Sequence, residues 1–249
     1  MDASPVLRAS LPTHAMRPPL TSMTRPSRRP GPGRPPRQYA DGSGTRDALI
    51  RCGVKILTEK SFAATSIGEI LGLLNVPKGS FYHYFDSKEA FGCAVIDHYA
   101  QYFANKLDRL LLDPRQPPLQ RVWGFIEEAC CGMVRHQFQR GCLIGNLGQE
   151  MSSLPEAFRA KLETTFIDWQ QRLARCLHEA RQTGALLPEA DCEQLAAFFW
   201  IGWEGAVLRA KLERTVTPLL ICAQGFVNGL PCAPGQTPPR PTSRHGQPG

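Results

Sequence analysis

Several features that are typical of metal-binding, secreted and membrane proteins are missing from this chain of 249 residues. Its nine cysteines are odd in number and include no C-x-x-C pair, so neither a zinc site nor a disulfide framework is indicated. No apolar run approaches the roughly 18 residues of a transmembrane helix, and no signal-peptide core is present. We therefore expect a cytoplasmic protein without membrane contact, in which most thiols are small buried apolar groups.

Catalytic spacings are missing as well. Residues 141–151 contain three glycines, but they lack the order of a phosphate-binding loop and follow no strand. Neither a G-x-S-x-G elbow nor an H-E-x-x-H pair occurs. The sequence therefore does not indicate an enzyme, and we expect no cofactor and no metal.

The net positive charge is confined to the two ends of the chain. Residues 1–44 hold seven arginines against two aspartates, residues 231–249 hold two more arginines, and the segment between is neutral. Because these ends are also rich in proline and poor in bulky apolar residues, we predict a disordered basic arm at 1–44 and a disordered tail at 231–249. A basic arm suits a polyanion. Alternatively it is a solvated linker, or translation starts at Met16 or Met23.

From residue 45 onward the apolar spacing is helical. It predicts a helix over 45–60 and a second, short one over 67–74, which Ser66 and Glu69 would begin as a capping box. Asn75 tolerates the left-handed conformation of a tight turn, and Pro77 suits the first turn of the next short helix. Two short helices joined by a tight turn, after a longer helix, predict a helix-turn-helix.

The third helix carries an unusual set of rings, since residues 76–91 contain five aromatic side chains and a histidine. Phe81 and Phe85 are spaced i, i+4, so we assign both to the core. The remaining arc is rich in hydrogen-bonding groups that can reach base edges and phosphates. A solvated face is the alternative, but such faces favour Glu, Lys and Gln over Tyr and His. The predicted DNA-contacting residues on this arc are Lys78, Gly79, Ser80, Tyr82, His83 and Tyr84.

Residues 65–67, 76–85 and 87–89 together resemble the DNA-binding domain of the TetR family of one-component transcriptional repressors. The resemblance implies that the third helix enters the major groove and that Lys88, at the start of the fourth helix, binds phosphate. It also implies backbone contacts at the start of the first helix. The resemblance thus adds four further DNA-contacting candidates, Thr45, Arg46, Thr65 and Ser66.

The rest of the chain reads as helices over 87–112, 119–137, 143–151, 155–183, 191–214 and 218–230. The first of these would span roughly 39 Å, enough to connect two domains. No strand alternation occurs, so the predicted fold class is all-α. We expect a helix-turn-helix DNA-binding domain at 45–91 and a helical ligand-binding and dimerisation domain at 92–230.

Residues 198–213 suggest the oligomeric state. Small residues at Gly202, Gly205, Ala206 and Ala210 would let another helix approach closely, which suits a homodimer interface formed with the last helix. A two-fold dimer would read a palindromic double-stranded operator. Ordinary packing within one chain is the alternative.

Residues 76–91, 141–151 and 200–213 are most similar to the acrylate-responsive repressor branch of the family. A neighbouring branch, the electrophile-sensing repressors, has a reactive cysteine and a lysine at the positions of Cys142 and Lys211. The sequence after Cys142 departs from that branch, which favours binding of a small acid over thiol chemistry.

A site for an unsaturated carboxylate needs an apolar wall and a cationic or amide donor. The predicted walls are Trp123, Trp169, Trp200 and Trp203, and the predicted donors are Asn146, Gln149, Arg209 and Lys211. Each Trp could instead be plain core, and Cys142 a small buried apolar group. The sequence therefore predicts a homodimeric repressor that a small effector releases from DNA. The alternatives are a thiol-based electrophile sensor and a ligand-binding protein without operator specificity.

Overall fold

A computed structural model describes residues 44–232, so the arm predicted at 1–44 and the tail predicted at 231–249 lie almost entirely outside the described residues. Within them the chain is helical, apart from one isolated bridge between Leu186 and Cys232. The all-α prediction is confirmed. The helices are α1 (Thr45–Glu59), α2 (Ile67–Leu74), α3 (Lys78–Tyr84), α4 (Lys88–Leu111), α5 (Pro118–Arg135), α6 (Leu143–Gln149), a 3₁₀ turn (Met151–Ser153), α7 (Glu156–Gln182), α8 (Cys192–Glu213) and α9 (Thr217–Asn228).

Local capping explains the beginnings of α2 and α4. The Ser66 hydroxyl accepts from the amide of Glu69, and the Ser87 hydroxyl accepts from the amide of Ala90. Asn75 ends α2 in the left-handed conformation, with φ 51°, as predicted for the tight turn. Pro77 lies one residue earlier than predicted, because its extended ψ of 145° makes it the N-cap of α3.

Three helix ends fall two residues short of the predicted boundaries, one of them that of the helix expected over 218–230, which stops at Asn228. The helix expected over 119–137 stops at Arg135, since Gln137 and Phe138 both take positive φ values, 51° and 57°, that an α-helix cannot continue. The helix expected over 143–151 stops at Gln149 and continues as a 3₁₀ turn. These corrections leave the order of the helices unchanged.

Helices α1, α2 and α3 share a core with the first turns of α4. Phe81 and Phe85 are buried as predicted, and both rings contact Phe91 of α4 at centroid distances of 5.4 and 5.1 Å. A side chain at Gly53 of α1 would lie 2.6 Å from Phe91 and Val95. Because α1 and α4 approach this closely, the helix-turn-helix is fixed to the N-terminal end of the long helix.

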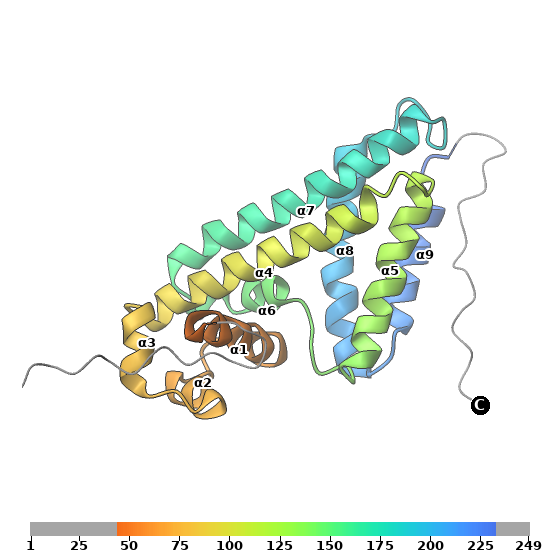
Figure 1. Ribbon diagram of the computed structural model, residues 1–249. Helices are drawn as coiled ribbons and strands as arrows, with labels where there is room; N and C mark the ends of the chain where they lie inside the picture. The colour runs from red at the N-terminus through yellow and green to blue at the C-terminus, as the bar shows by residue number, and fades with distance from the viewer. Residues whose placement is uncertain (1–43, 233–249) are drawn as a thin grey trace, which may run out of the picture. The chain divides into compact units, whose positions relative to one another are not determined.

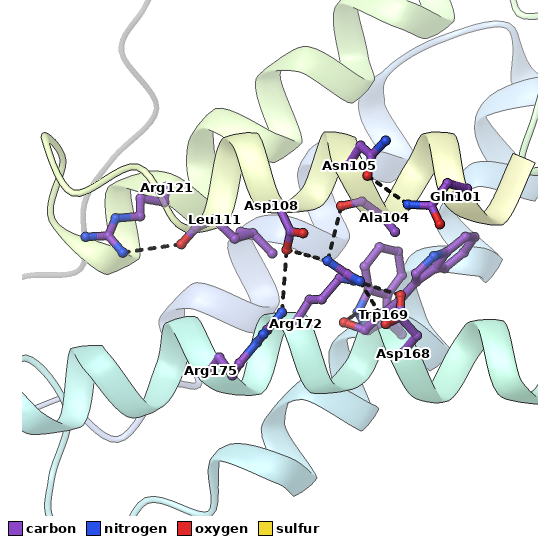
Figure 2. A network of polar contacts seen from close by, with 11 residues as sticks. Gln101, Ala104, Asn105, Asp108, Leu111, Arg121, Asp168, Trp169, Arg172 and Arg175 are labelled. Atoms are coloured by element: carbon purple, nitrogen blue, oxygen red, sulfur yellow. Dashed lines mark hydrogen bonds and ion pairs between the residues drawn. The ribbon is translucent and has the colours of Figure 1, made fainter.

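Helices α4 and α7 lie side by side in Figure 1, and α4 is about 36 Å long. A polar seam joins them in Figure 2, where Arg172 of α7 reaches Asp108 and the Ala104 carbonyl on α4. Near the other end of the seam, the buried guanidinium of Arg121 on α5 contacts both oxygens of Glu179 at 2.6 and 2.8 Å. These contacts tie α4, α5 and α7 together.

The core of the C-terminal helices is aromatic. Rings from α4, α5, α7 and α8 pack against one another, mostly tilted or edge to face, at centroid distances of 4.4–6.3 Å, and the Trp200 indole N–H donates to the carbonyl of Trp169 at 3.0 Å. Such packing fixes the relative positions of these helices. The rings belong to Phe103, Phe125, Trp169, Phe199, Trp200 and Trp203.

The outer face of α8 and α9 is apolar and exposed. Large side chains on this face are between 39 and 75% exposed, namely Phe198, Ile201, Leu208, Leu212, Leu220 and Ile221. On α8 they follow a 3–4 spacing that passes through the exposed Gly205. The predicted small-residue stripe is divided, because Ala206 and Ala210 are buried within the chain while Gly202 and Gly205 lie on the exposed face. That part of the prediction was wrong, since the two alanines pack inside.

Candidate nucleic-acid interface and effector cavity

The short helix α3 presents the predicted donor-rich surface. Its buried face is Phe81, and Lys78, Gly79, Tyr82 and His83 are exposed. A Cβ on Gly79 would meet no atom within 4 Å, so the backbone there can be approached closely. Ser80 and Tyr84 are half-buried at the edges of this face. The helix can therefore offer an ammonium, two rings and backbone to a groove.

A cavity of about 490 Å³ lies between α1, α4, α5 and α8, next to the N-terminus of α6. Its apolar wall includes Phe103, Phe125, Trp200, Trp203 and Val207. This volume falls within the range of small-molecule sites, and aromatic walls with a few polar groups are typical of them.

Three polar side chains meet on one wall of the cavity. Glu204 of α8, Tyr99 of α4 and Cys142 at the start of α6 all line the cavity, and the carboxyl of Glu204 lies beside Cys142 at Gly145. Burial raises the pKa of Glu204 to about 7 and raises the pKa of Tyr99 well above its usual value. Glu204, Cys142 and Tyr99 form what we call the acid cluster.

The rest of the cavity lining carries an excess of positive charge. Five basic side chains, which we call the cationic mouth, are Arg51, Lys55, Lys106, Arg135 and Arg140. Glu128 pairs with Lys106 at 3.2 Å, and Arg140 pairs with Glu59 at 3.1 Å. Because the lining holds five Lys and Arg side chains and two acids, Glu128 and Glu204, an anionic ligand is attracted into the cavity.

Helix α6 connects the cavity to the helix-turn-helix. Its N-cap residue is Cys142, whose sulfur accepts from the amide of Gly145 at 3.3 Å. The Asn146 amide donates to the carbonyls of Leu57 and Thr58 at the end of α1, both at 3.1 Å. A movement of the cavity wall at α6 would therefore act on α1 through these hydrogen bonds.

A second contact lies just beyond α6. The Glu150 carboxylate accepts from the amides of Phe62 and Ala63, in the loop between α1 and α2, at 3.1 and 3.3 Å. Asn146 and Glu150 thus hold both sides of the same turn of the DNA-binding helices.

Residues 49–91 match the family model described as bacterial regulatory proteins, tetR family. Residues 118–226 match the one described as tetracyclin repressor-like, C-terminal domain. Over 203 residues the chain is 50% identical to the transcriptional regulator AcuR of Cereibacter sphaeroides, a match that covers 81% of this chain and 92% of AcuR. The chain belongs to the TetR family.

The chain is also similar to other regulators of this kind in sequence and in structure. The chain is 32% identical over 176 residues to the HTH-type transcriptional repressor NemR of Escherichia coli K12, covering 70% of this chain and 88% of NemR. The crystal structure of regulatory protein TetR from Rhodobacter sphaeroides superimposes with a TM-score of 0.72 at 48% identity, covering 74% of this chain and 97% of that one. For the reduced form of E. coli NemR the TM-score is 0.68 at 28% identity, covering 75% and 97%. These relatives are regulators, so the prediction that the chain is no enzyme is confirmed.

Two general properties of the described residues bear on the site. Within residues 44–232 no helix combines the length and the apolar character that crossing a bilayer requires. The same residues include no group of three His, Cys, Asp or Glu side chains placed to hold a metal ion.

Several predicted DNA contacts lie elsewhere than expected. The Thr45 and Thr65 side chains are buried, and the Thr65 hydroxyl donates to the carbonyl of Ser61 at 2.8 Å, so neither side chain faces a ligand. The Lys88 ammonium donates to the carbonyl of Phe62 at 2.7 Å and lies 4.4 Å from the centre of its ring. To bind phosphate, Lys88 would have to leave these partners.

The two remaining candidates are better placed for DNA. Arg46 is exposed, with its guanidinium 5.4 Å from the ring centre of Phe85. Ser66 is also exposed, although its oxygen already caps α2. Both therefore stay predictions as phosphate contacts.

Of the predicted effector residues, the cavity brings together Cys142, Trp200 and Trp203. Trp123 and Trp169 are plain core, as the alternative interpretation held, because both are buried among other apolar side chains and neither lines the cavity. Asn146 donates to α1 rather than into the cavity. These three placements are corrections to the predicted site.

The other three predicted donors also point elsewhere. Arg209 is exposed and its guanidinium pairs with Glu213 at 2.6 Å. Gln149 is exposed and contacts the Gly145 carbonyl at 3.4 Å. The Lys211 ammonium lies 3.4 Å from the carbonyl of Thr58, outside the cavity lining. The donors that do face the cavity come from the cationic mouth.

Neither Glu204 nor Tyr99 was among the effector residues predicted from the sequence. Glu204 lies one turn after Trp200, so it is an acid on an otherwise apolar face, which is a signal that the sequence did contain. Tyr99 belonged to the apolar set of its helix, and nothing in the spacing shows that its hydroxyl reaches α6. Only the packing of α4, α6 and α8 brings the acid cluster together.

The acid cluster also determines the chemistry of the predicted sensor cysteine. Burial raises the pKa of the Cys142 thiol well above its usual value, and the nearby Glu204 carboxylate raises it further. The thiol is therefore held in its neutral form, whereas reactive cysteines sit beside positive charge. Lys211, the expected cation, is engaged with Thr58.

Proposed function

We propose that this TetR-family regulator is a homodimeric repressor that binds a palindromic operator through α3 and is released by a small unsaturated acid such as acrylate. The DNA-binding part is supported by the exposed donors of α3 on a helix whose other face is fixed by Phe81. The effector part is supported by the cavity, with its aromatic wall and cationic mouth, and by the resemblance to the acrylate-responsive branch. The observation that carries the proposal is the connection of this cavity to α1 through α6.

Operator binding is tested by substitution on α3. Tyr82→Ala and His83→Ala should each weaken specific binding by about 1–3 kcal/mol, roughly five- to 150-fold, because each removes contacts to base edges or phosphate. His178→Ala, on α7, is the matched control and should bind like the wild type. Fluorescence anisotropy on DNA from the upstream region measures all three. If both α3 variants bind as tightly as the wild type, the assignment of the recognition helix is wrong.

Dimerisation is supported by the apolar face of α8 and α9. An exposed stripe of Ile201, Leu208 and Leu212 with a heptad-like spacing is suited to a second copy of the same helices. A two-fold arrangement of this isologous surface would place two α3 helices on successive half-sites. An interface of this kind needs no other partner.

Release follows from the α6 connection. An effector that binds on the cavity wall favours a different position of α6, and Asn146 and Glu150 transmit that change to α1 and the following loop. The two recognition helices of the dimer would then no longer match successive major grooves, and DNA is released.

A thiol-based electrophile sensor is the second candidate, because Cys142 lies on the cavity wall. The raised pKa of its thiol disfavours that chemistry. Release from DNA under reducing conditions, followed by dilution, separates the two candidates. Reversibly bound acrylate dissociates on dilution and DNA binding returns, whereas DNA binding does not return when the thiol has been alkylated. Cys142→Ser should keep the acrylate response and lose any response to alkylating agents.

A ligand-binding protein without operator specificity is the remaining alternative. It would bind upstream DNA and scrambled DNA of the same length with equal affinity. A clear preference for the upstream sequence at moderate salt excludes it, because non-specific binding depends on phosphate charge alone.

A further inference from the structure

The wall of the cavity contains an acid that no cation balances. Among the described residues Glu204 makes no ion pair, and its carboxyl lies beside Cys142. Its carboxyl packs directly on the first turn of α6, where any side chain at Gly145 would collide with it. An unpaired carboxylate in such a place is costly, so the neutral acid is favoured.

The neighbours of Glu204 do not change this conclusion. Tyr99 of α4 and Cys142 at the start of α6 are both neutral, because burial raises the pKa of each. Lys211 lies on the same face of α8, two turns further on, but its ammonium contacts the carbonyl of Thr58. Below about pH 7 the acid cluster is therefore a set of neutral donors that faces the aromatic wall of the cavity.

We propose that Glu204, in its protonated form, donates a hydrogen bond to the carboxylate of a small monocarboxylate effector, so that effector binding takes up a proton. This inference rests on the proposed small-acid effector and names the residue that recognises it. An ionised Glu204 would repel the carboxylate within the same apolar space, whereas the protonated acid forms a charge-assisted hydrogen bond with it.

The energetic cost of protonation is small near neutral pH. Burial raises the pKa of Glu204 to about 7, so the proton is present on a large fraction of molecules before the effector arrives. The carboxylate of a free monocarboxylate stays ionised in this range, because its ordinary pKa is near 4. The cationic mouth attracts the anion into the cavity, and the protonated Glu204 then recognises its carboxylate at the wall.

Other ionisable groups face the same cavity and provide the necessary controls. Besides the cationic mouth they are Glu128 on α5, Tyr102 and His98 on α4, and His136 between α5 and α6. Burial and the nearby Arg140 and Arg135 lower the pKa of His136. Since histidine ordinarily changes charge between pH 5 and 8, the two imidazoles must be separated from Glu204 by substitution.

Isothermal titration calorimetry with acrylate, and with propionate as its saturated analogue, tests the proposal on the full chain. If only the protonated form of Glu204 binds, affinity should be about tenfold weaker at pH 8 than at pH 6. Repeating the titration in buffers of different ionisation enthalpy should show uptake of about one proton per site at pH 8 and almost none at pH 6. A flat affinity without proton uptake overturns the proposal and leaves the small-acid effector standing.

Two variants assign the proton. Glu204→Gln keeps a neutral donor of similar shape, so acrylate should bind it with nearly the same affinity at pH 6 and pH 8. The double variant His98→Gln, His136→Gln should keep the tenfold pH slope of the wild type. A wild-type slope in Glu204→Gln, or a lost slope in the histidine variant, overturns the assignment to Glu204.

Two further outcomes are informative. If Glu204→Gln does not fold, the proton uptake of the wild type together with the histidine variant decides. If neither acrylate nor propionate binds at any pH, the proposed effector class and this inference both fail. Binding without pH dependence overturns only the inference, which separates the two.

Discussion

Substitution of Asn146 by Ala tests the connection between the cavity and the DNA-binding helices. The side-chain amide of Asn146 donates to the Leu57 and Thr58 carbonyls at 3.1 Å each. A hydrogen bond contributes about 0.5–1.5 kcal/mol to stability, so the loss of two would cost about 1–3 kcal/mol. The Thr58 carbonyl also accepts from the Gly141 amide at 3.0 Å, which leaves it satisfied in the variant. We therefore expect the free energy of unfolding to fall by about 1–2 kcal/mol.

The same change should weaken the coupling between effector and DNA. The variant leaves α3 and the cavity wall intact, so operator affinity without effector and acrylate affinity without DNA should stay within about twofold of the wild type. If these bonds carry the coupling, release from operator should require roughly five- to thirtyfold more acrylate, the equivalent of about 1–2 kcal/mol.

Urea denaturation gives the stability and fluorescence anisotropy with titrated acrylate gives the coupling. Gln149→Ala is the matched control, because Gln149 is an exposed amide on the same helix whose one contact lies within α6, and it should behave like the wild type in both assays. An Asn146→Ala protein that unfolds less stably but releases DNA at the wild-type acrylate concentration would refute the proposed route through α6.

The remaining predictions concern stability, assembly and thiol chemistry. Arg121→Met should lower the free energy of unfolding, measured in urea, by about 2–3 kcal/mol, because a buried guanidinium that is paired with a carboxylate is lost. The control Arg175→Met removes an exposed contact of 3.5 Å and should cost less than about 1 kcal/mol. Equal losses in the two variants would contradict the stabilising role of Arg121. Leu212→Glu, on the exposed face of α8, should convert the dimer to a folded monomer in sedimentation velocity, and an unchanged dimer would rule that face out. At pH 8 the Cys142 thiol should react with iodoacetamide more slowly than an unfolded cysteine, because its pKa is raised. Faster reaction, measured by mass spectrometry, would support the electrophile sensor. Because the pKa of Glu204 is raised in the folded state, protonation of Glu204 contributes to stability at low pH, and this contribution should be lost as pH rises from about 4.5 through about 7. The free energy of unfolding of Glu204→Gln should therefore depend less on pH than that of the wild type.

The helix-turn-helix could be predicted almost completely from local signals. Ser66 caps the helix that it was predicted to cap, and Phe81 and Phe85 are buried while Tyr82 is not. These features depend only on residue types and spacings within a few positions, so they can be predicted from the sequence alone. Thr65 and Lys88 were predicted to contact DNA, but their hydrogen bonds go to the carbonyls of Ser61 and Phe62 in the loop between α1 and α2.

The effector site could be predicted only in part, because it is formed by helices distant in the sequence. Glu204 and Arg209 lie five residues apart on α8, so they point about 140° away from each other, and only one can face the cavity. Which one does so depends on how α8 packs against α4 and α6. Likewise Trp123 and Phe125 lie on opposite sides of α5, and the structure places Phe125 at the cavity.

The most direct test of the account is fluorescence anisotropy of the full-length protein on DNA from its own upstream region, with acrylate titrated in under reducing conditions. We predict tight, sequence-dependent binding, saturable release by acrylate, and full rebinding after dilution. Tight binding that acrylate does not affect would contradict the proposed effector. Equal binding to scrambled DNA would contradict the repressor itself.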